Sequence, residues 1–151
     1  MKKLLLFSIV FLTISVFISG CGEDKVYGCK DNTAKNYKSS ANENCCCQYD
    51  ADVVWWMTEA TADTYRNDLG ITTLTYTLDG VTIGTSTTDK FCAAEPSECG
   101  QAGAATFTKD IGETMGPVVL VGEVKGDNGT IIWTGNVSVT ANGCTKIEIT
   151  L

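Results

Sequence analysis

The spacing of apolar and polar residues divides the chain into three parts. Residues 4–18 are apolar with a few hydroxyl side chains, residues 22–50 are mostly polar, and from residue 51 onward apolar residues recur at every second position in several segments. Alternation with a period of two is typical of strands that bury one face. The chain therefore combines an apolar leader, a polar segment and a domain over 51–151 that we predict to be built of strands.

Three segments alternate most clearly, namely 72–78, 130–140 and 145–151. Their apolar side chains should point into one core, and their threonines and other polar side chains should point outward. The residues predicted to face inward are Leu74, Tyr76, Leu78, Ile131, Trp133, Val137, Val139, Ile147, Ile149 and Leu151. Further strands are predicted at 53–57, 81–85, 104–109 and 118–124.

The connections between these segments also favour strands. Asp79-Gly80 and Asn128-Gly129 lie between apolar runs, and these dipeptides are typical of tight hairpin turns. Helical spacing is weak throughout, and at most one helical turn is expected within 59–68. Seven strands in about a hundred residues predict an all-β fold, a single antiparallel β-sandwich.

The leader has the length of a secretion signal. A helix that spans a bilayer needs roughly 20 apolar residues, whereas residues 4–18 are fewer, follow the positive pair Lys2-Lys3 and precede the small pair Ser19-Gly20. We therefore interpret residues 1–20 as a signal peptide.

The four residues Ile18-Ser19-Gly20-Cys21 resemble a bacterial lipobox. This resemblance implies that Cys21 becomes the first residue and carries lipid on its sulfur and amine, so that the membrane is a partner through this anchor. Each buried methylene of an acyl chain contributes about 0.8 kcal/mol to membrane attachment. A plain signal peptide and an uncleaved anchor are the alternatives, and no cofactor other than the covalent lipid is expected.

Residues 21–26 should form a polar tether. Gly22-Glu23-Asp24-Lys25 resembles the charged stretches that follow the lipid cysteine in surface-exported lipoproteins of Bacteroidetes-type bacteria. The resemblance implies a cell-envelope protein that is anchored in the outer membrane and exposed at the cell surface. A solvated spacer is the alternative interpretation.

Residues 27–50, the cysteine-rich segment, resemble a short motif of secreted and surface proteins in the same bacterial group. Such a segment has few apolar residues, and a covalent cross-link is expected to compensate for the missing core. The match departs from the usual pattern at Lys30 and at Glu43-Asn44, which weakens a calcium-binding interpretation because Ca²⁺ needs several oxygen ligands. The matching positions are Gly28-Cys29, Asp31, Thr33-Ala34, Asn36-Tyr37 and Cys47-Gln48-Tyr49.

Seven cysteines follow Cys21, and export permits them to form disulfides. Their odd number leaves at least one unpaired or paired with another chain. Adjacent Cα atoms lie about 3.8 Å apart, closer than the roughly 4.4 Å at which disulfides begin to be found, so neighbouring cysteines should have different partners. The motif resemblance implies Cys29–Cys47, and the further predicted pairs are Cys99–Cys144 and Cys92 with either Cys45 or Cys46.

Composition narrows the chemistry. Without Lys2 and Lys3 the chain has 9 basic and 18 acidic residues, a net charge of −9, which disfavours nucleic acid as a partner. The sequence has no histidine, no Cys-x-x-Cys spacing and no nucleophile or phosphate-loop motif. We therefore expect no enzyme activity, no metal site and no redox pair.

Residues 51–151 resemble small lipoprotein domains with a transthyretin-like or carboxypeptidase-regulatory-like sandwich. The motifs that match are structural, and an immunoglobulin-like strand order would match them equally well. These motifs are Ile83-Gly84, Cys99-Gly100, Trp133-Thr134-Gly135 and Cys144.

Trp55 and Trp56 are the candidate ligand contacts. Neighbouring residues of a strand point to opposite faces, so one indole should enter the core. The other is expected either to be covered by the cysteine-rich segment, the interpretation that we favour, or to lie at the surface, where aromatic side chains contact sugars and proteins. Trp133 is expected in the core.

Together these features favour a non-catalytic binding or adhesion module that its lipid holds at the cell envelope, with a glycan or an envelope protein as partner. The alternative is a structural subunit of an envelope or appendage assembly, in which a spare cysteine or a sheet edge joins the chains. Neither interpretation requires a catalytic residue.

Overall fold

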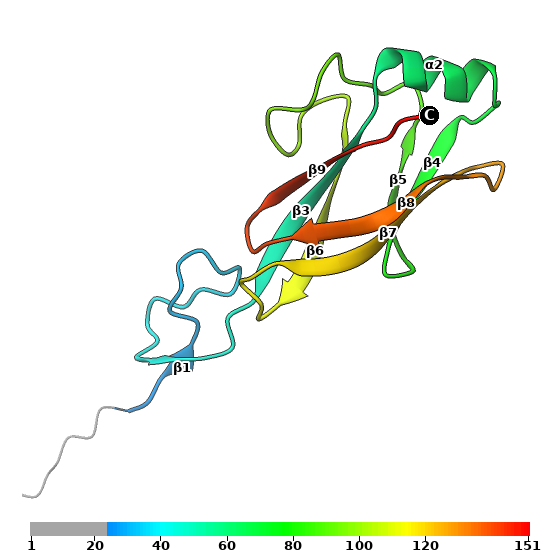
Figure 1. Cartoon of the computed structure of the whole chain (residues 1–151). Helices are drawn as coiled ribbons and strands as arrows, with labels where there is room; N and C mark the ends of the chain where they lie inside the picture. Colours follow the sequence, from blue (N-terminus) through cyan, green and yellow to red (C-terminus); the bar gives the residue numbers. More distant parts are fainter. Residues whose placement is uncertain (1–23) are drawn as a thin grey trace, which may run out of the picture.

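The computed structural model describes residues 24–151, so the predicted signal peptide and the predicted lipid site Cys21 lie outside the described residues. The described chain is elongated (Figure 1). The cysteine-rich segment lies at one end, a sandwich of two β-sheets follows, and the helix α2 and the C-terminus lie at the opposite end. Within 24–151 no helix has the length and apolar character needed to cross a membrane.

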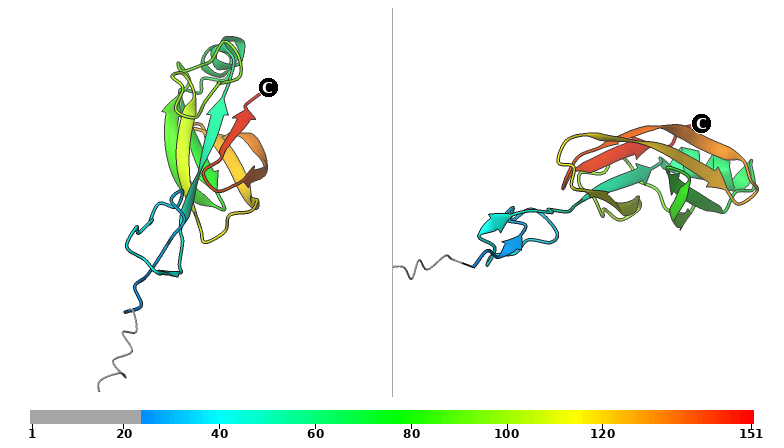
Figure 2. Two further views of the ribbon diagram at one scale, coloured as in Figure 1. Left: turned by 90° about the vertical axis from the view of Figure 1, so that its left-hand side faces the viewer. Right: turned by 90° about the horizontal axis from the view of Figure 1, so that it is seen from below.

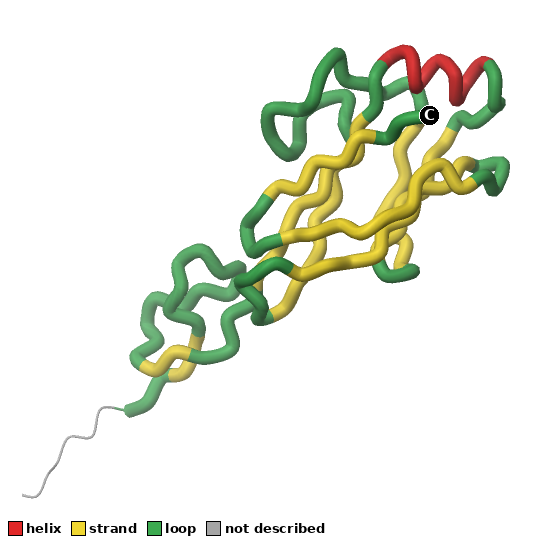
Figure 3. Tube along the Cα trace, in the orientation of Figure 1, coloured by secondary structure: helices red, strands yellow, loops and turns green. Residues whose placement is uncertain are grey.

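Seven strands form the sandwich, as predicted, although their ends differ from the predicted bounds (Figure 3). The three-stranded sheet has the order β6-β3-β9, and the four-stranded sheet has the order β5-β4-β7-β8. The strands are β3 (Tyr49–Trp56), β4 (Thr73–Leu78), β5 (Val81–Thr87), β6 (Ala105–Gly112), β7 (Val118–Gly126), β8 (Ile131–Val139) and β9 (Cys144–Glu148). Two short strands, β1 (Tyr27–Gly28) and β2 (Glu43–Asn44), pair in parallel within the cysteine-rich segment.

One strand pair of the sandwich differs from the predicted antiparallel arrangement. β9 lies parallel to β3, whereas the other pairs of the sandwich are antiparallel. The chain leaves the four-stranded sheet after Val139 and enters the three-stranded sheet at Cys144, beside Asp52 of β3. The last strand therefore arises from a change of sheet and not from a hairpin, and this is why its direction matches that of β3.

The core lies between the two sheets and is centred on Trp55. This indole is 1% exposed, and its ring lies 5.2 Å from Tyr76, 6.2 Å from Phe107 and 6.4 Å from Trp133. Gly84 on β5 makes room for the cluster, since a Cβ at this position would overlap the ring of Phe107. The predicted inward residues that are buried are Leu74, Tyr76, Leu78, Val137, Val139 and Ile149.

The prediction that Ile131 and Leu151 face inward is wrong, because they are 54% and 72% exposed. A register shift between β7 and β8 lets Ile132 pack against the core while Ile131 points away from it. β9 ends at Glu148 and leaves Leu151 beyond the sheet. Trp133 lies at the margin of the core, where it is partly buried.

The predicted turn at Asp79-Gly80 joins β4 to β5. Both residues have positive φ angles, 50° and 75°, as a type I′ hairpin turn requires. The carboxylate of Asp79 accepts a hydrogen bond of 2.8 Å from the amide of Val121 on β7. The turn residue thus links the hairpin to the next strand of the same sheet.

The helix α2 (Glu59–Asn67) covers the far end of the sandwich and is longer than the single turn expected (Figure 1). The hydroxyl of Thr58 caps it by accepting a backbone N–H of the first turn, and Ala62 and Tyr65 are buried beneath it. Few apolar residues mark its inner face, which is why the periodicity of the sequence predicts no full helix. Thr58 as a cap and Gly70, with its φ of 64°, are the signals that mark its two ends.

The cysteine-rich segment has a small core of its own and extends from the end of the sandwich (Figure 2). Cys29, Ala34 and Tyr49 are buried together, and a disulfide joins Cys29 to Cys47. The phenol of Tyr49 donates a hydrogen bond of 2.7 Å to Asp31, the largest cause of the lowered pKa of that carboxyl. Because Tyr49 also begins β3, the segment and the sandwich share one continuous strand.

Candidate functional site

The outer face of the three-stranded sheet has a covered half and an open half. Along β3 the side chains that point away from the core are Asp50, Asp52, Val54 and Trp56. Val54 and Trp56 are 0% and 9% exposed, so their half of the face is covered. The two aspartates, which are only partly buried, occupy the open half.

The loop between β5 and β6, residues 88–104, covers the apolar half. A disulfide joins Cys99 of this loop to Cys144 at the start of β9. Lys146 of β9 also reaches the loop and donates a hydrogen bond of 3.1 Å to the carbonyl of Ser97. The covalent bond and the hydrogen bond hold the loop against the outer face of the sheet.

Both candidate tryptophans are therefore buried. Trp55 is in the core, and Trp56 lies near Lys90 and Gly103 of the 88–104 loop. The cysteine-rich segment joins the opposite end of β3, so the prediction that it covers Trp56 is wrong. Neither indole lies at the surface, where a ligand would contact it.

The open half of the face forms a polar groove of about 330 Å³, called here the junction groove. Its side chains offer carboxylate, hydroxyl and amide groups from two strands and one turn. The hydroxyl of Thr108 on β6 donates a hydrogen bond of 2.6 Å to Asp52 on β3. The lining residues are Asp50, Ala51, Asp52, Thr108, Asn142 and Gly143.

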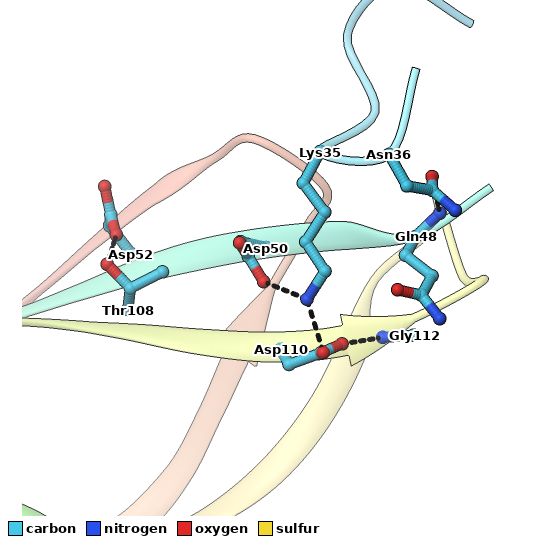
Figure 4. A network of polar contacts seen from close by, with 8 residues as sticks. All are labelled: Lys35, Asn36, Gln48, Asp50, Asp52, Thr108, Asp110 and Gly112. Atoms are coloured by element: carbon cyan, nitrogen blue, oxygen red, sulfur yellow. Dashed lines mark hydrogen bonds and ion pairs between the residues drawn. The ribbon is translucent and has the colours of Figure 1, made fainter. Parts of the chain in front are cut away.

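Lys35 connects the cysteine-rich segment to the edge of the junction groove (Figure 4). Its ammonium lies 3.0 Å from Asp50 of β3 and also pairs with Asp110 of β6. The bond from Lys35 is the largest cause of the lowered pKa of Asp110, and the amide of Gly112 is the second. In return Asp110 and then Asp50 raise the pKa of Lys35, so this network joins the two parts of the molecule through charge.

The polar groups that line the junction groove can form hydrogen bonds with a ligand. Carboxylate and carbonyl oxygens accept hydrogen bonds from hydroxyl or amine groups, and the Thr108 hydroxyl can also accept one. Between residues 24 and 151 no cluster of three or more histidine, cysteine or acidic side chains is placed to hold a metal ion. Sequence reasoning assigned no role to Asp50 and Asp52, although their alternation with Ala51 and Val53 places them on one face.

Two of the predicted disulfides are confirmed. Cys29 and Cys47 are bonded within the cysteine-rich segment, with their Cα atoms 4.7 Å apart. Cys99 and Cys144 are bonded across the outer face of the sandwich, with their Cα atoms 5.8 Å apart. One disulfide thus closes each part of the molecule.

The prediction that Cys92 pairs with Cys45 or Cys46 is wrong. The structure bonds Cys45 to its neighbour Cys46, so the expectation that adjacent cysteines have different partners also fails. Cys92 is a free thiol, 4% exposed, and burial raises its pKa. Its amide bonds the carbonyl of Met57 at the far end of β3, so the sandwich separates it from the other two cysteines.

Comparison with known proteins adds no assignment. No protein-family model, curated protein or solved structure matches the chain.

Proposed function

We propose that the chain is a lipid-anchored protein of the cell envelope and that its sandwich is a non-catalytic binding module. The observation that carries the proposal is an apolar leader that ends at Cys21 and precedes a body closed by Cys29–Cys47 and Cys99–Cys144. Disulfides form and persist outside the reducing cytosol, which supports export. Acyl chains on Cys21 would then hold the body at a membrane.

The junction groove is the binding surface that we propose, with a glycan as the partner. Sugars present many hydroxyl donors, and Asp50 and Asp52 offer carboxylate oxygens to accept them. The net negative charge of the chain opposes the binding of anionic polymers, which favours a glycan without acidic groups. An envelope protein with exposed amines is the other partner that this lining could accept.

The anchor is tested by replacing Cys21 with serine and separating membranes from soluble material. We expect Cys21→Ser to move the protein into the soluble fraction, because serine cannot carry the thioether-linked lipid. Cys92→Ala, which changes a cysteine of the body, should stay with the membrane. Full membrane retention of Cys21→Ser would contradict the anchor.

The groove is tested on a glycan array with Asp52→Asn and Thr108→Ala. Both changes remove acceptor or donor groups from the lining, and each should weaken binding to the same glycans. Thr85→Ala is the matched control, because Thr85 is exposed on β5 of the other sheet. Unaltered glycan binding by both groove variants would exclude the junction groove as the site.

A structural subunit of an envelope assembly is the second candidate. It is favoured by Val119 and Val121, which are 62% and 56% exposed on β7, since contiguous apolar surface often marks a contact between proteins. Cys92 is buried and therefore does not serve as the spare cysteine in this role. If β7 joins chains, the double variant Val119→Thr/Val121→Thr should dissociate the assembly in size-exclusion chromatography. An unaltered protein that is monomeric at every concentration would exclude this role.

A further inference from the structure

The sulfur atoms of the described chain differ in what they contribute to the fold. Cys29–Cys47 and Cys99–Cys144 close the two parts of the molecule, and Cys92 is buried. Cys45 is partly exposed and Cys46 is exposed, at the end of β2 in the cysteine-rich segment. Cys144 is exposed as well, but its bond to Cys99 closes a loop of the sandwich, whereas the bond between Cys45 and Cys46 closes no loop of the chain.

The backbone around Cys45 and Cys46 is held without their sulfur atoms. The amide of Cys45 donates to the carbonyl of Gly28 at 3.1 Å, and the side chain of Asn36 donates to the carbonyl of Cys46 at 2.7 Å. These bonds lie on both sides of the peptide that joins the pair. Opening the sulfur–sulfur bond would therefore leave the local chain path in place.

The Cys45–Cys46 bond also adds little constraint to the chain. In the chain-entropy model the stabilisation by a disulfide rises with the length of the loop that it closes. The separations are 18 and 45 residues for the two structural disulfides but 1 for Cys45 and Cys46. A disulfide to another chain would use the same sulfur atoms, and its Cα–Cα separation would not be fixed by a peptide bond between the two cysteines.

Charge selects the part of the surface through which two copies can approach. The cysteine-rich segment, 27–50, carries three lysines and three acidic residues, so its formal net charge is zero. Residues 51–151 carry 5 basic and 13 acidic residues, a net charge of −8. Two sandwiches repel each other at neutral pH, whereas two cysteine-rich segments can come into contact.

We propose that Cys45 and Cys46 form an exchange site through which two copies of this chain become covalently joined. A small thiol in its thiolate form attacks one sulfur of the intrachain bond and forms a mixed disulfide, and the released thiolate then attacks the corresponding bond of the second copy. Two intrachain bonds break and two interchain bonds form, so no net oxidation occurs. The thiolate freed on the second copy then attacks the mixed disulfide of the first copy, which forms the second interchain bond and releases the small thiolate. The small thiol therefore acts only as a catalyst.

The inference is independent of the glycan-binding proposal, because the junction groove takes no part in the exchange. It is tested with the protein purified from the cells that make it, concentrated and incubated with a substoichiometric amount of reduced glutathione at mildly alkaline pH. We expect a species of twice the monomer mass in non-reducing electrophoresis, which excess dithiothreitol converts to monomer. Peptide mapping by mass spectrometry should place the interchain bonds at Cys45 and Cys46.

The double variant Cys45→Ser/Cys46→Ser should lose the dimer and keep the circular dichroism spectrum of the unaltered protein. Cys92→Ala is the matched control and should still form the dimer, because its sulfur is buried. A protein that remains monomeric with glutathione at every concentration would overturn the proposal. So would a dimer that persists in the double variant, or interchain bonds that map to other cysteines.

Discussion

Trp55 shows how much of the fold depends on one side chain. It contacts aromatic rings from β4, β6 and β8 and so links strands of both sheets. Its indole Nε1 is buried and has no hydrogen-bond partner among the described residues, which costs free energy in an apolar environment. The packing of the rings therefore offsets an unpaired donor at the centre of the core.

We predict that Trp55→Ala lowers the free energy of unfolding by about 3–5 kcal/mol, because it leaves a large cavity. Trp55→Phe should cost clearly less, since it keeps an aromatic ring and removes the unpaired N–H. Urea unfolding followed by circular dichroism measures both. Equal losses in the two variants would contradict the stabilising role of ring packing at this position.

Residues that follow strict alternation could be predicted from the sequence. Leu74 and Leu78 are fully buried as predicted, because β4 keeps its pleat over its whole length on the inner face. Ile131 could not be placed, because the register shift in the β7–β8 pair exchanges it with Ile132. A bulge depends on the neighbouring strand, and the alternation of a single segment does not contain that information.

At the scale of elements, α2 depends on its ends more than on its apolar face. The hydroxyl of Thr58 accepts the amide of Thr61, and Arg66 in the last turn donates to the carbonyl of Thr88 at 3.0 Å. The second bond ties the helix to the start of the 88–104 loop. Capping and tertiary contact therefore stabilise a helix that its periodicity alone does not predict.

We predict that Thr58→Ala lowers the free energy of unfolding by about 1 kcal/mol through loss of the N-cap. Thr64→Ala is the matched control, since Thr64 lies within the helix and alanine has the higher helix propensity. The control should therefore be neutral or slightly stabilising. Thermal unfolding of both variants, measured side by side, checks the difference.

The position of the 88–104 loop depends on the disulfide between Cys99 and Cys144. We predict that Cys99→Ser/Cys144→Ser lowers the free energy of unfolding by about 4 kcal/mol in the chain-entropy model, given a separation of 45 residues. Because the loop covers Trp56, its release should also shift tryptophan fluorescence to longer wavelength. Stability loss without a fluorescence shift would show that the loop stays in place without its disulfide.

The strands could be predicted as elements, but their connections could not. Three alternating segments, four further predicted strands and the Asp79-Gly80 turn indicate a sandwich, and the sandwich is present. The parallel direction of β9 and the cover over Val54 and Trp56 follow from long-range contacts. These two features decide where the junction groove lies, which explains why sequence reasoning pointed to the tryptophans and missed Asp50 and Asp52.

At the scale of the whole molecule, two kinds of contact hold the cysteine-rich segment against the sandwich: Ile111 and Ala141 pack against its small core, and Lys35 forms ion pairs with the sandwich. Asp110 has a pKa below the ordinary 3.8, chiefly because of the bond from Lys35. The carboxylate form is thus favoured when the segment is docked. The stabilisation is complete above pH 3.8 and is lost as the pH falls through the lowered pKa, because protonation removes the ion pair.

We predict that amide exchange in the cysteine-rich segment accelerates below pH 3.8, relative to its intrinsic rate, as docking weakens. Asp110→Asn should reduce this pH dependence and accelerate exchange at neutral pH as well. The pH dependence that remains comes from Asp31, whose pKa is lowered chiefly by the hydrogen bond from Tyr49. Glu59→Gln, at the far end of the molecule, is the control and should leave exchange in the segment unaltered. Identical pH profiles for Asp110→Asn and the unaltered protein would contradict the role of the ion pair.

The position of β3 has a mechanical consequence. This strand carries the chain out of the cysteine-rich segment and is the middle strand of its sheet, hydrogen-bonded to β6 on one side and β9 on the other. A pull on the amino-terminal end acts along the strand, so the rows of hydrogen bonds on both sides bear the load together in shear. An edge strand pulled sideways would instead lose its hydrogen bonds one at a time. Because β3 is a central strand, the connection between the cysteine-rich segment and the sandwich resists such a pull.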